Sequence, residues 1–181
     1  MNRQPLIAHI PALRRYARAL SGDAWAADDL VQDTLERACT KWRLWLVGSD
    51  LRAWLFTIMH NLYVSQVRQR VRQGDLAHPV DLAELNQEPA APASYADSAI
   101  DLQRCLLRLP DEQRVVLLLV TLEDLSYAEV AKITGVPVGT VMSRLSRARS
   151  RLQELMDASA PPSVRSVAVT ESEVPPLRRL K

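Results

Sequence analysis

Apolar residues in the first half of the chain recur at intervals of three and four, the spacing that places them on one face of an α-helix. The pattern runs over residues 7–20, ends at a Ser-Gly pair, and resumes over residues 23–42. Ser49 or Asp50 is a suitable N-cap for a third helix that continues to about residue 72. The first half therefore predicts three helices, each with one face available for packing.

The second half repeats the helical spacing in four segments. Residues 97–109 carry regular apolar positions up to a proline, and residues 111–119 contain an apolar run that implies burial on several sides. Ser126 is expected to cap a short helix that ends near residue 134, and a last helix is expected from about residue 137 to 156.

Composition favours helices over sheets in all of these segments. Glycine is scarce, with 5 residues, and aromatic residues make up 5% of the chain. The predicted fold class is all-α, with two small helical domains joined by a flexible linker and a helix-turn-helix in the second. We place the first domain at 1–72, the linker at 73–96, the second domain at 97–156, and a tail at 157–181 whose Pro-Pro pairs are typical of disorder.

The net charge of +2 conceals a strong segregation of charge along the chain. Residues 1–70 contain ten basic and six acidic residues, whereas residues 71–103 contain one basic and six acidic residues. Basic blocks on both sides of an acidic connector suit a protein that faces a polyanion.

The chain shows no pattern that indicates catalysis or metal binding. Cys39 and Cys105 are far apart, the three histidines are dispersed, and no glycine-rich phosphate loop or nucleophile–base constellation occurs. We therefore expect no enzyme activity, catalytic residue, cofactor or metal. The longest apolar run, Val115 to Val120, is too short to cross a bilayer, and the N-terminus lacks a signal region, so we expect a cytoplasmic protein without membrane insertion.

Residues 126–152 predict a DNA-binding helix-turn-helix. Gly135 can adopt the positive φ that a tight turn between two helices requires. A helical wheel gives the last helix one apolar side and an opposite side of hydroxyls and arginines, which match phosphates and guanine edges. A solvated basic helix would carry the same arginines, but their coincidence with the cap and the turn favours DNA binding. The predicted reading face comprises Thr140, Ser143, Arg144, Arg147 and Arg151.

Two helices of the first domain carry further polar patterns. The helix over 23–42 has an acidic side opposite its apolar face, formed by Asp28, Asp29, Gln32, Asp33 and Glu36. An ordinary solvated face would look the same. The third helix presents Asn61, Val64 and Arg68 on one side away from its core stripe, and Phe56 and Tyr63 on another side, where packing is favoured over stacking on bases.

These motifs resemble those of the extracytoplasmic-function group of bacterial RNA polymerase sigma factors, within the sigma-70 superfamily. Residues 126–131 and 139–149 are similar to the promoter-reading region of that group. Residues 28–34 are similar to its polymerase-binding helix, and residues 51–55 with Asn61 are similar to its promoter-melting helix. Two motif sets in the right order and at the right separation carry the resemblance over about residues 7 to 156.

The resemblance implies a function in transcription initiation. It implies that the acidic side of the second helix docks on the β′ coiled coil of core RNA polymerase. It also implies that Asn61, Val64 and Arg68 contact the minus-ten element and that the reading face of the last helix contacts the minus-35 element. The implied partners are core polymerase, including its β flap, promoter DNA and an anti-sigma factor.

Two other functions remain open at this level. A conventional regulator that binds duplex DNA independently of polymerase accounts for residues 126–152 but not for residues 28–33 or 54–61. A helical interaction protein that binds an acidic partner through its basic helix accounts for neither the order of the motifs nor the charge pattern.

Overall fold

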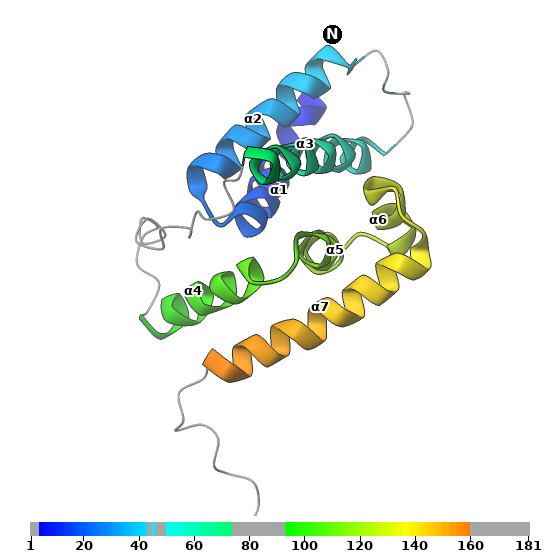
Figure 1. The fold of residues 1–181 in the computed structure, drawn as a ribbon. Helices are drawn as coiled ribbons and strands as arrows, with labels where there is room; N and C mark the ends of the chain where they lie inside the picture. Colours follow the sequence, from blue (N-terminus) through cyan, green and yellow to red (C-terminus); the bar gives the residue numbers. More distant parts are fainter. Residues whose placement is uncertain (1–3, 43–44, 46–49, 74–92, 160–181) are drawn as a thin grey trace, which may run out of the picture.

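The structure is a computed structural model that describes residues 4–42, 45, 50–73 and 93–159. Over these ranges it contains helices and no strand, which confirms the all-α prediction. Figure 1 shows two groups of helices, which we call the first unit (α1 to α3) and the second unit (α4 to α7). The helices are α1 (Gln4–Ser21), α2 (Ala24–Thr40), α3 (Leu51–Gln73), α4 (Ala93–Leu107), α5 (Asp111–Thr121), α6 (Tyr127–Thr134) and α7 (Val138–Ser159).

The helix ends follow from the capping chemistry of the sequence. Asp23 accepts hydrogen bonds from the backbone N–H groups of the first turn of α2, and Asp50 does the same for α3. Ser126 and Glu129 form a reciprocal capping box at the start of α6, and Gly135 ends that helix with φ of 69°. These predicted boundaries are confirmed.

Two helix boundaries differ from the expectation. The helix α4 begins at Ala93, inside the segment interpreted as linker, and α7 continues to Ser159, beyond the expected end near residue 156. The rest of the interpreted linker, residues 74–92, and the rest of the tail, residues 160–181, lie outside the described residues.

The core of the first unit lies between α1, α2 and α3. Tyr16 of α1 and Phe56 of α3 are each 1% exposed, and their rings meet edge to face with centroids 5.3 Å apart. Leu13, Leu55 and Met59 are completely buried around them. Because Phe56 and Tyr63 are both buried, the expectation that they pack rather than stack on bases is confirmed.

The core of the second unit is centred on α5, whose residues 115–119 are all buried. Ile133 of α6 and Val141, Leu145 and Ala148 of α7 cover it. Val138, the first residue of α7, is 43% exposed although it is apolar.

The two units pack against each other, which the sequence did not predict. The helix α1 contacts α4 and α5, and α3 contacts α6. Gly22, at the end of α1, has φ of 74° and lies so close to Leu107 of α4 that a Cβ atom there would be 2.4 Å from a Leu107 methyl carbon. The predicted two-domain chain therefore has a closed arrangement in this structure.

Candidate polymerase and DNA interfaces

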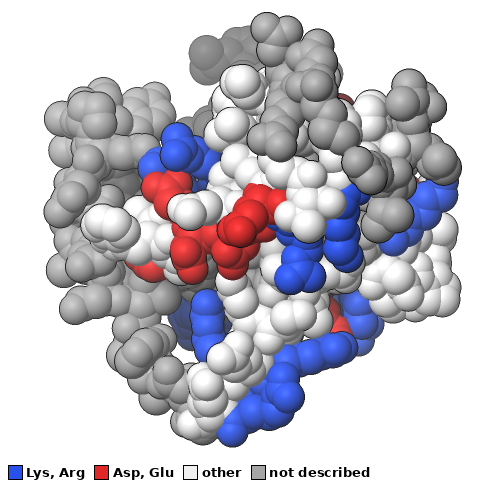
Figure 2. Space-filling view, turned by 90° about the horizontal axis from the view of Figure 1, so that it is seen from above, with Lys and Arg blue, Asp and Glu red and all other residues white. Residues whose placement is uncertain are grey.

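The acidic side of α2 is on the surface of the first unit. Asp29, Gln32 and Glu36 are exposed, whereas Asp28 and Asp33 are half-buried. Asp28 accepts a hydrogen bond from Arg14 Nε of α1 at 3.0 Å, and both side chains are about half exposed, so this ion pair contributes little to stability. Figure 2 shows acidic side chains gathered in the middle of one face of the molecule, with basic side chains around them.

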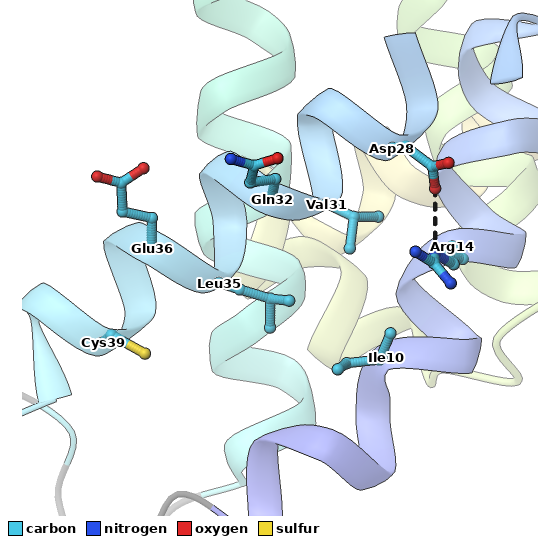
Figure 3. A pocket seen from close by; sticks show the side chains of 8 residues that line it. All are labelled: Ile10, Arg14, Asp28, Val31, Gln32, Leu35, Glu36 and Cys39. Atoms are coloured by element: carbon cyan, nitrogen blue, oxygen red, sulfur yellow. Dashed lines mark hydrogen bonds and ion pairs between the residues drawn. The ribbon is translucent and has the colours of Figure 1, made fainter. Parts of the chain in front are cut away.

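A groove of about 520 Å³ runs between α1 and α2 beside these acidic residues. Val31 and Leu35 of α2 and Ile10 of α1 point into it, while Gln32 and Glu36 stand at its edge (Figure 3). An apolar centre with a polar and charged rim is the usual anatomy of a protein–protein interface. The remaining lining residues are Arg14, Asp28 and Cys39.

The polar side of α3 is accessible over its second half. Asn61 and Arg68 are exposed and Val64 is half-buried, and their spacing places them along one side of the helix. Burial, and next the positive charge of Arg144, lower the pKa of the neighbouring His60. His60 is half-buried, so the side of α3 that carries it is more enclosed than the adjacent side that carries Asn61.

Three of the five predicted reading residues of α7 are exposed to solvent. Ser143 is exposed, and the Nε atom of Arg147 donates to its backbone oxygen at 3.2 Å. Arg151 forms an ion pair of 3.0 Å with Glu154, in which both side chains are more than half exposed. These hydroxyl and guanidinium groups are available to phosphates and base edges without rearrangement of the fold.

Arg144 and Thr140 are placed differently from the other three. Both are half-buried, and the Arg144 side chain is only 19% exposed because it forms an ion pair with Glu112 of α5 and lies near His60 of α3. The wheel grouped Arg144 with the outward donors, but in the structure it lies at the border of the apolar stripe. In this arrangement it faces protein rather than solvent.

Glu123, the most deeply buried charged residue of the described ranges, belongs to none of the motifs in the sequence. Its side chain has no exposed surface, and its two carboxylate oxygens accept hydrogen bonds from Arg15 at 2.8 Å and from Arg52 at 2.9 Å. Arg52 also donates to the backbone oxygen of Glu123. The sequence contains one indication that Glu123 is buried: it lies in a short loop between two apolar residues, Leu122 and Leu125, and the Leu125 side chain is buried.

A second polar junction joins the units next to α5. The Tyr63 hydroxyl of α3 donates to the Asp111 carboxylate at 2.7 Å and accepts from the buried guanidinium of Arg114 at 2.8 Å. Arg114 also donates to the carbonyls of Leu106 and Leu107 at the end of α4 and to that of Leu109 just beyond it. Burial raises the pKa of Tyr63 to about 12, so its hydroxyl keeps its proton at neutral pH.

Both units match known protein families. Residues 6–60 match the family described as the Sigma2 domain of PhyR, and residues 99–152 match Sigma-70, region 4. A protein of Rhodopseudomonas palustris (strain TIE-1), described as ECF RNA polymerase sigma factor EcfG, is 41% identical over 154 residues, which cover 85% of this chain and 84% of the relative. The chain belongs to the extracytoplasmic-function group of RNA polymerase sigma factors.

Solved structures, one of them of a sigma factor, show the same fold. The sigma factor RpoE of Bartonella quintana, in complex with the anti-sigma factor NepR, aligns with a TM-score of 0.70 and 37% identity over 87% of this chain and 98% of that one. CnrH, in complex with the cytosolic domain of CnrY, aligns with a TM-score of 0.63 and 26% identity over 87% of this chain and 88% of that one.

The sigma factor therefore binds RNA polymerase and directs promoter-specific initiation of transcription. A regulator that acts independently of polymerase is not favoured, because relatives match both units and not only the helix-turn-helix. Its relatives are sigma factors, which are not enzymes. None of the described helices is long and apolar enough to span a membrane.

Proposed function

We propose that the sigma factor docks on the β′ coiled coil of core polymerase through the acidic side of α2 and the groove beside it. Asp29, Gln32 and Glu36 are exposed there, and the apolar floor contributed by Val31 and Leu35 gives a partner helix a surface to bury. Charge complementarity with a basic partner would raise the rate of association and set the register. The observation that carries the proposal is this acidic, grooved face on the same chain as an exposed arginine side of α7.

The proposal assigns the minus-ten element to the first unit, at Asn61, Val64 and Arg68. An amide and a guanidinium on one side of α3 supply hydrogen bonds to base edges and to phosphate, and Val64 supplies an apolar contact for an unstacked base. Arg70 and Arg72, exposed at the end of the same helix, extend the positive charge that single-stranded DNA requires.

The proposal assigns the minus-35 element to α7 of the second unit. Ser143, Arg147 and Arg151 are accessible as donors, and Thr140 and Arg144 complete the face once they are uncovered. The second unit would also contact the β flap of polymerase. Catalysis by this chain itself forms no part of the proposal, and the site of action is the cytoplasm, where core polymerase works.

An anti-sigma factor is part of the same proposal. RpoE, a structural relative, is described in a complex with the anti-sigma factor NepR, and CnrH in a complex with the cytosolic domain of CnrY. By this similarity we expect a dedicated protein that holds the sigma factor away from polymerase until a signal releases it.

Run-off transcription with core polymerase on fragmented genomic DNA of the source organism tests the function. Transcripts that start at discrete sites only when the chain is added are the expected result, and mapping their starts gives the promoter elements. The matched control is the Asn61→Ala variant, which should bind core polymerase but yield fewer transcripts. No promoter-dependent transcript with any fragment would contradict the proposal.

A second function is suggested by the match of residues 6–60 to the Sigma2 domain of PhyR. PhyR of Bartonella quintana is described as an anti-anti-sigma factor in complex with NepR. A protein that only imitates a sigma factor would bind an anti-sigma factor but would give no transcripts with core polymerase. The accessible arginines of α7 favour the sigma factor, because an imitation does not need a DNA-reading face.

A further inference from the structure

We propose that the closed packing of the two units is a self-inhibited state of this sigma factor, and that Glu123 is the latch that holds the units together. The inference rests on the proposed function for its DNA contacts but not for the latch itself. It concerns a contact within the chain, between α1 and α3 of the first unit and the loop that joins α5 to α6 of the second.

The closed arrangement is incompatible with reading two promoter elements at once. The names of the minus-ten and minus-35 elements place them about 25 base pairs apart, which is roughly 85 Å at ~3.4 Å of duplex axis per base pair. A compact chain of this length has a radius of gyration of only ~16 Å. In the closed structure, moreover, α3, which carries the proposed minus-ten surface, packs against α6 of the helix-turn-helix.

The chain has enough length to open between the units. Residues 74–92 connect α3 to α4, and a segment of that length can span at most ~65 Å. The units themselves add to this reach. Both proposed DNA surfaces can therefore reach their elements only after the units separate.

Glu123 is the group on which the closed arrangement depends most. Its carboxylate is completely buried, and both arginines that hold it, Arg15 and Arg52, come from the first unit. The next residue, Asp124, adopts a positive φ of 50°, a conformation that few residues other than glycine, asparagine and aspartate tolerate. This turn of the backbone directs Glu123 toward the first unit while Leu125 enters the core of the second.

The polar junctions at Glu123 and at Tyr63 respond differently to opening. Asp111 and Arg114 belong to the same helix and remain paired when the units separate, so only Tyr63 has to exchange its partners for water. Glu123 instead leaves both arginines at once. A buried carboxylate that loses its cationic partners is strongly destabilising in a closed state, whereas three hydrated charges in an open state are not. Changes at Glu123 should therefore shift the balance toward the open form.

Opening would also uncover the covered part of the reading face. The Arg144 side chain is only 19% exposed and is paired with Glu112 of its own unit, while its positive charge also acts on His60 of α3. When α3 moves away, the only remaining competitor of DNA for Arg144 among the described contacts is the exposed Glu112 carboxylate. The closed state thus withholds one arginine from promoter DNA.

Small-angle X-ray scattering of the full chain tests the latch without DNA. The charge reversals Glu123→Arg and Arg52→Glu, one in each unit, should each increase the radius of gyration by about a quarter or more, as expected for separated units. The double variant that carries both reversals restores opposite charges and should return toward the wild-type value. The matched control is Asp101→Arg, which reverses a charge in an exposed ion pair within α4 and should scatter like the wild type.

The helical content of each variant is measured by circular dichroism, because a charge reversal that unfolded helices would also increase the radius of gyration. If a reversal reduces the helical content, Glu123→Gln replaces it, because this variant removes the charge and keeps the shape of the side chain. Glu123→Gln should also increase the radius of gyration. Wild-type scattering from folded variants with either reversal or with Glu123→Gln would overturn the latch. An equal expansion in Asp101→Arg would overturn it as well.

Binding of a short fluorescent duplex of mixed sequence at low salt tests the inhibition. Folded, expanded variants should bind at least about fivefold more tightly than the wild type, the lower range of couplings between two sites. Expansion without tighter binding would overturn the inhibition while leaving the latch in place. Failure of the proposed promoter function would appear separately, as absent run-off transcripts from a chain that opens normally.

Discussion

The substitution Gly22→Ala tests the contact between α1 and α4. Gly22 ends α1 with φ of 74°, a conformation that costs a residue with a Cβ atom ~1–2 kcal/mol. The new methyl group would also lie 2.4 Å from one Leu107 methyl carbon and 2.9 Å from the other. Overpacking of this kind costs ~1–3 kcal/mol, because Leu107 has to move.

The two costs act on different parts of the protein and can be separated. The backbone cost belongs to the first unit, and the steric cost exists only where α4 packs against it. Together they predict a loss of about 2–5 kcal/mol and a decrease of the melting temperature by roughly 5–20 °C. In a Leu107→Ala background the collision disappears, so Gly22→Ala should cost only ~1–2 kcal/mol there.

Urea unfolding of the wild type, the two single variants and the double variant measures both terms in one double-mutant cycle. The expected coupling energy equals the steric cost, ~1–3 kcal/mol. A coupling below ~0.5 kcal/mol, which is typical of sites that do not touch, would refute the contact between Gly22 and Leu107. A Gly22→Ala variant as stable as the wild type would refute the backbone argument too.

Four further predictions follow from the interfaces and the helix ends. Arg147→Ala should weaken binding to the minus-35 element by ~1–3 kcal/mol, which is about 5- to 150-fold in a fluorescence titration. Its affinity for core polymerase should stay unchanged, and an equal loss of both affinities would mean that Arg147 has a structural role. Asp33→Lys should lower the affinity for core polymerase about fivefold or more, and undiminished co-elution would count against the docking face. Ser126→Ala removes the cap of α6 and should lower the free energy of unfolding by ~1 kcal/mol in urea, with no change expected if the cap is unimportant. Burial and Arg144 hold the pKa of His60 below 6.5, so the folded state disfavours its protonation. The free energy of unfolding should therefore fall as the pH drops below about 6.5, and His60→Gln should remove that part of the decrease; identical pH profiles would contradict the assignment.

Local chemistry made a large part of the fold predictable. Capping residues act on the backbone within a few positions of themselves, so the helix ends at Asp23, Ser126 and Gly135 can be predicted from the adjacent sequence. The core followed from the same local information, because the apolar face of a helix is fixed by its period. The exposure of Asn61, on a side of α3 away from its core stripe, was predictable in this way.

Contacts between distant segments were not predictable from such patterns. Glu123 is separated by 71 residues from Arg52 and by 108 from Arg15, and an acidic residue in a loop ordinarily faces water. The wheel could not place Arg144 either, because its neighbours Glu112 and His60 come from other helices. Helical periodicity identifies the surfaces of a helix but does not reveal which of them a second unit covers.

The sharing of one carboxylate between Arg15 and Arg52 has a consequence for how this chain tolerates mutation. If either arginine is lost, the other still holds one oxygen of Glu123, so a single substitution on the arginine side should do less damage than a substitution of the glutamate. The basic side of this contact is redundant because it has two arginines, whereas the acidic side depends on Glu123 alone. Random change in related chains would then be expected to alter Arg15, whose side chain is 53% exposed, more readily than Glu123, whose side chain is fully enclosed.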